Sequence, residues 1–150
     1  AIRTAWSLVP DDVDHVFHLE DDFTFNRPVD LDDLADVLDA HPNVAQMALR
    51  RQPVNQAEAD AGGLIEMWPD EYADRRTGPH RWLEHRLFFT TNPSIYRRSL
   101  TDRRWPDAPR SEAKFTDELT ADGFSFGYWG TRHDGPWVTH IGSERVGVGY

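Results

Sequence analysis

The stretch DHVFHLEDDFTF, residues 14–25, decides the fold, because in it an apolar segment runs directly into three consecutive acids. Residues 13–19 alternate and are rich in β-branched and aromatic side chains, which predicts a β-strand. Glu20, Asp21 and Asp22 then fall at the carboxyl end of that strand, where open α/β sheets bind ligands. Adjacent carboxylates repel one another, so this position indicates a bound divalent cation; the alternative is a solvated acidic turn.

Downstream of the acids, the sequence alternates between helical and strand patterns. Residues 31–40 carry apolar side chains at helical spacing, and Asp30 before them is the expected N-cap. Residues 44–49 predict a second strand, which ends in Arg50 and Arg51. Strand, helix and strand in this order are typical of an α/β domain.

The rest of the chain continues the α/β pattern after one interruption. Residues 52–80 turn polar and contain the glycines and prolines of turns, so we expect a long irregular excursion there. Pro93 is expected to stop the strand that follows. Further elements are expected at residues 2–8 (the end of a helix), 82–90 (strand), 112–122 (helix capped by Ser111), 124–129 (strand) and 137–141 (strand).

Composition limits the class of protein. A chain of 150 residues with 39% hydrophobic residues predicts one domain, residues 1–150, with a real core. The formal charge of −10 repels polyanions and disfavours nucleic acid as a partner. The absence of cysteine excludes disulfides and thiolate zinc sites. No apolar stretch approaches the roughly 20 residues of a membrane span, so we expect a soluble, cytoplasmic protein.

His140 is the histidine whose setting best suits metal binding. It lies in the strand-like segment WVTHIG, residues 137–142, and the glycine that follows lets backbone approach a ligand. A neutral imidazole joins carboxylates in Mn²⁺-type sites; the alternative is a hydrogen-bonded core histidine. His15 and His18 lie three apart, which places them on opposite faces of a strand, so they are not expected to chelate together.

Glu112 is a candidate general base. Helical rotation places it at the N-terminal tip of the apolar stripe of its helix, directed inward. A carboxylate held at a cleft can remove a proton from a hydroxyl group. The alternative is a residue that only complements the helix dipole.

Four tryptophans raise the question of sugar stacking. An indole ring offers a flat apolar face, although large aromatic residues pack in the core by default. The four are Trp68, Trp82, Trp129 and Trp137.

Four blocks of sequence, taken in order, resemble those of a known family. They are HLEDDF (residues 18–23), FFTTNPS (88–94), SEAKFTDEL (111–119) and HIGSERVGVGY (140–150). The chain resembles nucleotide-sugar-dependent glycosyltransferases of the GT-A fold, family 2-like, and looks closest to small bacterial and phage members. The resemblance implies a Rossmann-like mixed sheet flanked by helices. Only 19 residues precede the acidic motif, so we expect the fold to be truncated at its N-terminal nucleotide-binding part.

The resemblance also implies roles for individual residues. Asp22, in the place of the family's DXD motif, and His140 would bind a divalent cation, Mn²⁺ or Mg²⁺. Glu112 would be the catalytic base of an inverting reaction. The nucleoside-diphosphate sugar, as the donor, would contact Glu20, Asp21 and Arg145.

The expected function is therefore transfer of a sugar from a nucleoside-diphosphate sugar to the hydroxyl group of a glycan, a protein or a small molecule. Two alternatives stay open. A metal-dependent phosphohydrolase or nucleotidyltransferase would also use clustered acids and a histidine. A non-catalytic module that binds carbohydrate or a protein partner is the second. The sequence specifies neither the sugar, the nucleotide and the acceptor nor the oligomeric state.

Overall fold

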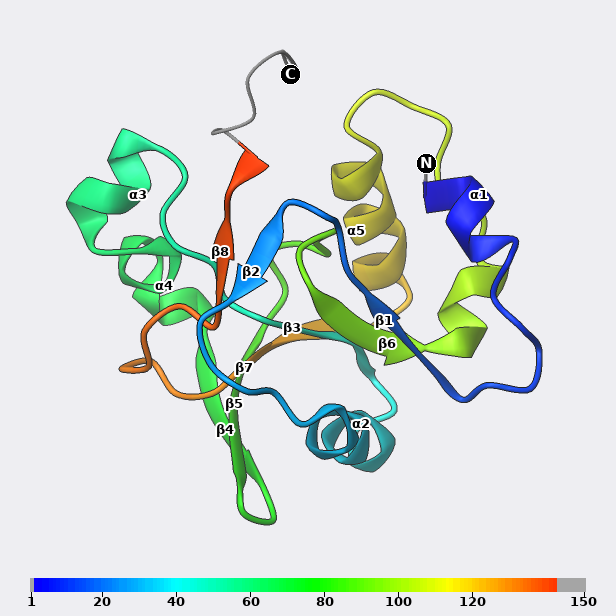
Figure 1. Cartoon of the computed structure of the whole chain (residues 1–150), viewed down its shortest axis with the longest axis horizontal. Coiled ribbons are helices and arrows are strands. Elements are labelled where there is room, and N and C mark those ends of the chain that lie inside the picture. The colour runs from blue at the N-terminus through cyan, green and yellow to red at the C-terminus, as the bar shows by residue number, and fades with distance from the viewer. Residues whose placement is uncertain (1, 143–150) are drawn as a thin grey trace.

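A six-stranded mixed sheet runs through the centre of the computed structural model, which describes residues 2–142 (Figure 1). Across the sheet the order is β1 His15–His18, β6 Ser94–Arg97, β3 Val44–Ala48, β7 Ser125–Trp129, β5 His80–His85 and β4 Ala73–Thr77. The neighbours β3 and β7 are parallel, and the other neighbouring pairs are antiparallel. A second, two-stranded sheet pairs β2 Phe23–Phe25 with β8 Val138–His140. The predicted α/β class is confirmed.

Helices cover both faces of the large sheet (Figure 1). The described helices are α1 Ile2–Trp6, α2 Leu31–Ala40, α3 Gln56–Ala61, α4 Leu64–Met67 and α5 Ser111–Ala121, with 3₁₀ turns at Pro69–Glu71 and Arg98–Asp102. Successive side chains of a strand point to opposite faces of the sheet, so Ile95 packs in the cluster of α2 while its neighbour Tyr96 packs in that of α5. None of the helices described is long and apolar enough to span a membrane.

The carboxyl ends of β1, β3 and β7 lie at one edge of the sheet. These strands point the same way, because β1 and β3 both run antiparallel to β6, and β3 is parallel to β7. β6 starts at the same edge, where Leu49 N donates a hydrogen bond to Pro93 O at 2.9 Å. We call this the carboxyl edge; the segments there that matter for the site are residues 19–22, 50–52 and 91–93.

The prediction for α2 is confirmed, including its N-cap. The side chain of Asp30 accepts a hydrogen bond from Asp32 N at 3.0 Å. The prediction for α5 is wrong by one residue at its start, because Ser111 already belongs to the helix. Arg110 precedes it with a φ of 57°, and no side chain caps this end.

The stretch 52–80 is structured, contrary to the expectation of an irregular excursion. It contains α3, α4 and β4, and Asn55 caps α3 by accepting a hydrogen bond from Glu58 N. Pro93 was expected to stop the strand of residues 82–90, but that strand, β5, already ends at His85, and Pro93 immediately precedes β6. A proline is tolerated there because it lies just before the first residue of the strand, where it pairs through its carbonyl and not through an N–H.

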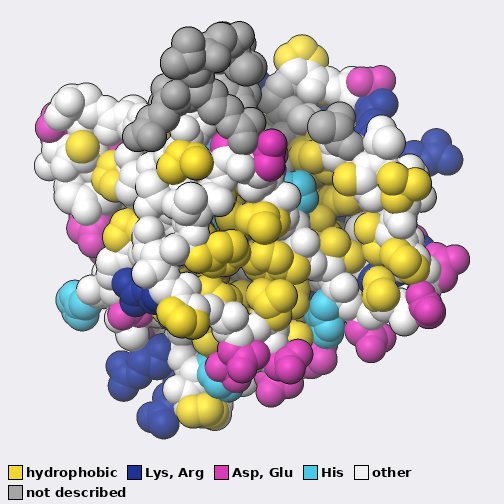
Figure 2. Space-filling view, in the orientation of Figure 1, with side chains coloured by type: hydrophobic (Ala, Val, Ile, Leu, Met, Phe, Trp, Pro, Cys, Tyr) yellow, Lys and Arg dark blue, Asp and Glu magenta, His cyan; other side chains and the backbone are white. Residues whose placement is uncertain are grey.

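One face of the molecule exposes apolar side chains. Figure 2 shows them gathered across the middle of the view, bordered below by acidic side chains. On β2 and at the start of α2, the exposed large hydrophobic residues are Phe25 and Leu31. The acids of α2 are Asp32, Asp33, Asp36 and Asp39.

Candidate functional site

The two predicted metal ligands, Asp22 and His140, touch each other. His140 Nε2 lies 3.1 Å from Asp22 Oδ2. The pairing of β2 with β8 brings them together, since Phe23 is opposite His140 and Ile141 N donates a hydrogen bond to Asp22 O at 2.7 Å. The side chain of Asp22 is 7% exposed, whereas that of His140 is 30% exposed. The pair therefore reaches the surface through the imidazole.

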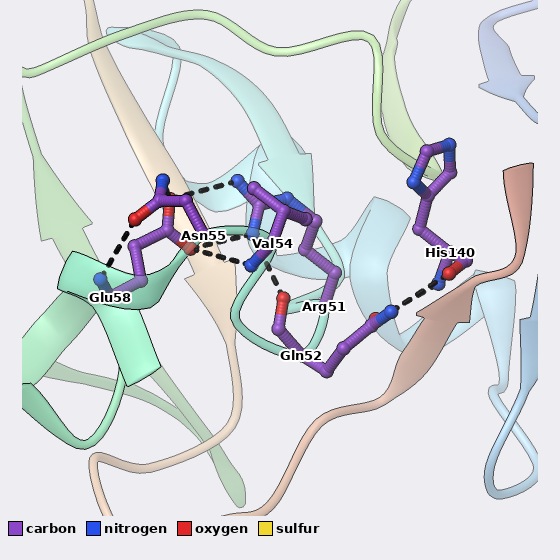
Figure 3. Close-up of polar contacts among 6 residues, drawn as sticks. All are labelled: Arg51, Gln52, Val54, Asn55, Glu58 and His140. Atoms are coloured by element: carbon purple, nitrogen blue, oxygen red, sulfur yellow. Dashed lines mark hydrogen bonds and ion pairs between the residues drawn. The ribbon is translucent and has the colours of Figure 1, made fainter. Parts of the chain in front are cut away.

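Gln52 fixes the backbone of His140 (Figure 3). Gln52 Nε2 donates to His140 O at 2.8 Å, and His140 N donates to Gln52 Oε1 at 2.9 Å. The side-chain amide thus pairs with β8 as a neighbouring strand would, while the imidazole points away from it (Figure 3). On the ring itself, Phe23 packs with its centroid 4.9 Å from that of the imidazole. These contacts limit the rotation of His140.

Arg51, the residue before Gln52, forms an ion pair with the buried Glu58. Arg51 Nη1 donates to Glu58 Oε2 at 2.8 Å, and Glu58 also accepts hydrogen bonds from Val54 N and the Asn55 amide (Figure 3). Burial by itself would raise the pKa of Glu58, but the hydrogen bonds and charge of Arg51, with those two further hydrogen bonds, bring the pKa below its ordinary value. Arg51 is therefore charge-compensated.

Glu112 lies in the first turn of α5 and faces the loop before β6. Its Oε1 accepts a hydrogen bond from Thr91 N at 2.7 Å. One turn later on α5, Thr116 Oγ1 accepts a hydrogen bond from Phe89 N at 2.8 Å. The two bonds hold the loop against α5. Within residues 2–142 no hydrogen bond reaches Glu112 Oε2, which leaves that oxygen available to a ligand.

Two hollows flank the N-terminus of α5. The first, the Glu112 pocket, has a volume of about 480 Å³ and is bounded by α5, the loop before β6 and the end of α4. The second, of about 660 Å³, is lined by both Glu20 and Ser111. The acidic strand end and the start of α5 therefore border one space, although the structure records no contact between Glu112 and the Asp22–His140 pair.

The other residues predicted for the site are Glu20, Asp21 and Arg145. Asp21 is exposed beside the buried Asp22, and Glu20 is half-buried, with its Oε1 4.0 Å from His18 Nε2. Arg145 lies outside the described residues. His15 contacts Asp39, so the two histidines of β1 have different neighbours, as expected for a strand.

The donor set at Asp22 and His140 fits a hard divalent cation that takes its other ligands elsewhere. Within residues 2–142 no three His, Asp or Glu side chains converge as a metal site. The separation of 3.1 Å is that of a hydrogen bond or ion pair between the two side chains, and it is also close to the spacing of about 3.0 Å between adjacent ligands of an octahedral ion with bonds of about 2.1 Å. Mg²⁺ is usually held by one or two carboxylates, with substrate phosphates and water completing the shell, and the imidazole of His140 favours a Mn²⁺-type ion.

Gly142 packs directly against the pair. A Cβ at this position would lie 2.6 Å from Asp22 Oδ2 and 2.8 Å from His140 Nε2, closer than real Cβ atoms approach. Any larger residue would therefore press on both donor atoms. This cradle is a second observation, independent of the donor atoms, that fits a ligand.

Gln52, Thr91 and the exact role of Gly142 were missed by the sequence analysis. Gln52 follows a strand end directly, and that position could have marked it as a polar residue at the edge of the sheet. Thr91 acts through its backbone N–H, for which a sequence carries no signal. Gly142 was noted only as a residue that lets backbone approach a ligand.

We compared the chain with known protein families, curated proteins and solved structures. The chain matches no known protein family, no curated protein and no solved structure. The function is therefore inferred from the chemistry and placement of the residues described above.

Proposed function

We propose that the protein is a metal-dependent glycosyltransferase that moves a sugar from a nucleoside-diphosphate sugar to an acceptor hydroxyl group, with inversion. The observation that carries the proposal is the Asp22–His140 contact beside Gly142. A carboxylate and an imidazole that meet beside a glycine suit a cation that also binds a diphosphate. The order of the four sequence blocks supports a GT-A-type fold for the domain.

The reaction needs two separate groups, and the chain offers both. Departure of a diphosphate requires charge stabilisation on one side of the anomeric carbon, which a cation held by Asp22 and His140 would supply when bound. The attacking hydroxyl loses its proton on the other side, where Glu112 Oε2 is available as the acceptor. Glu20, in the acidic motif, and Ser111, next to Glu112, line one hollow between these parts of the chain.

Thermal unfolding tests the donor site. Mn²⁺ together with UDP is expected to raise the melting temperature of the chain more than either alone, because a ligand that binds only the folded state stabilises it. Asp22→Asn and His140→Ala are expected to abolish the extra shift, and Asp36→Asn on the exposed face of α2 is the control. An unchanged shift in both site variants would refute the metal assignment. Release of phosphate from UDP alone would identify a phosphohydrolase instead.

Glu112→Gln tests the base. The variant should keep the shift produced by Mn²⁺ and UDP, because Glu112 is not part of the Asp22–His140 pair. Transfer, measured by mass spectrometry of the glycosylated acceptor, should fall by a factor on the order of 10² to 10⁴, since general-base catalysis is lost. Transfer at the parent rate would show that the base lies elsewhere.

A further inference from the structure

The Glu112 pocket has one wall that the proposed chemistry does not use, and this wall is aromatic. Trp68 follows α4 and lines the pocket. It is 45% exposed, in contrast to the buried Trp82 and Trp129. An indole that keeps almost half of its surface in water, at the wall of a hollow, is a ready surface for a flat apolar ligand face.

The same pocket presents polar groups that make no hydrogen bonds of their own. Among residues 2–142, neither the Asn92 side-chain amide nor the Asp117 carboxylate is hydrogen-bonded, and both line the pocket with Glu112. An amide donates and accepts, whereas a carboxylate accepts. A ligand that satisfies them needs several hydroxyl groups around its rim, with an apolar face toward Trp68.

Charge narrows the class of ligand further. Glu112 and Asp117 are acidic, and Arg51, the basic residue that lines the pocket, is compensated by Glu58 at 2.8 Å. The pocket therefore repels phosphates and carboxylated ligands. Its volume of about 480 Å³ lies within the range of roughly 300–1,000 Å³ that is usual for small-molecule sites.

We infer that the Glu112 pocket binds a neutral saccharide, stacked on Trp68, as the acceptor of the transfer; this assignment of acceptor rests on the proposed function. A hydroxyl group of that saccharide donates its proton to Glu112 Oε2. Its oxygen forms a bond to the anomeric carbon of the donor sugar, while the bond between that carbon and the diphosphate oxygen breaks. The diphosphate leaves with the electron pair of that bond.

Binding is measured on the full chain without nucleotide or metal, so that it reports on the pocket and not on catalysis. Saturation-transfer NMR uses the methyl glycosides of glucose, galactose and mannose, one at a time, with glucuronic acid and glucosamine as anionic and cationic comparisons. At least one neutral glycoside should give signals. Trp68→Ala should weaken its binding about fivefold or more, and Trp68→Phe should weaken it less, because a stacking surface remains. Phe25→Ala, which removes an aromatic side chain of equal exposure outside the pocket, should have no effect.

The outcomes separate this inference from the proposed function. If a neutral glycoside binds and its binding depends on Trp68, but the chain transfers no sugar, the saccharide site is supported and the proposed transferase function is refuted. If no glycoside binds and the chain transfers sugar to an acceptor that is not a saccharide, the saccharide site is refuted and the proposed transferase function is supported. Binding of only the charged sugars, or binding unaffected by Trp68→Ala, would also overturn the inference.

Discussion

At the scale of single residues, Gly142 sets the space beside the Asp22–His140 pair. Gly142→Ala introduces a Cβ within 3 Å of both side chains, so we expect loss of the shift in melting temperature produced by Mn²⁺ and UDP. Gly135→Ala is the matched control, because its Cβ would approach nothing closer than Arg27 at 3.5 Å. A full shift in Gly142→Ala would mean that the pair is not the cation site.

His85 is a second residue with a measurable consequence. Burial among aromatic rings lowers its pKa to about 3 from the ordinary 6.5, although the charge of Glu84 opposes the effect. Below pH 6.5 the unfolded chain therefore takes up a proton that the folded chain cannot, and stability falls as the pH falls toward 3. The loss is on the order of 1 kcal/mol per pH unit.

Urea unfolding between about pH 5 and pH 6.5 isolates this effect, because carboxylates titrate mainly at lower pH. His85→Phe should flatten the dependence of the free energy of unfolding on pH in that range, whatever its absolute stability. Replacement of the exposed His133 by Gln should leave the slope as it is in the parent. Equal slopes in the parent and in His85→Phe would show that His85 is protonated in the folded state.

At the scale of elements, the sequence predicted the helices and strands that have a strong residue pattern of their own. α2 has ten residues and an apolar stripe, and its bounds agree with the prediction. α3 and α4 have six and four residues, too few for a helical period to show. β4 reads ADRRT, with four exposed positions, and is held mainly by its pairing with β5. A short element that is stabilised mainly by the elements it packs or pairs with has only a weak pattern in its own sequence.

The N-cap of α2 gives a prediction at this scale. Asp30→Ala removes the acceptor for Asp32 N, and the expected cost is about 1 kcal/mol in the free energy of unfolding. Asp36→Ala, an exposed change in the middle of the same helix, should cost less, because alanine favours helix and no cap is lost. Urea titration measures both. Equal stability of Asp30→Ala and the parent would show that the cap contributes nothing.

At the scale of the whole molecule, the candidate site is assembled from distant parts of the chain. Asp22 and His140 are 118 residues apart, and Gln52, Thr91 and Glu112 come from three other segments. The sequence indicated that the acids, His140 and Glu112 carry chemistry. The resemblance implied that Asp22 and His140 share a cation, but the residue pattern alone did not bring them together, since the contact depends on β2, a strand of three residues that is too short for alternation to reveal.

The Arg51–Glu58 pair fastens the 52–80 segment to the sheet. Arg51→Met leaves the carboxylate of Glu58 buried without its cation, and the expected loss in the free energy of unfolding is on the order of 3 kcal/mol. The double change Arg51→Met with Glu58→Leu should recover most of that loss, because two apolar groups then replace the ion pair. Calorimetry or urea unfolding measures these free energies. If Arg51→Met is as stable as the parent, the ion pair does not contribute to stability.

The strand order has a consequence for synthesis on the ribosome. β3 and β7 are neighbours at the middle of the sheet, yet β7 ends only at Trp129. Among the strands of the large sheet, β4 and β5 are the neighbours that also follow each other directly in the chain. A nascent chain can therefore close that hairpin first and can pair β1, β6 and β3 only after Arg97, whereas β7, which joins these two parts of the sheet, comes later still. We expect late, slow folding that depends on dilution or on a chaperone to avoid association of incomplete chains.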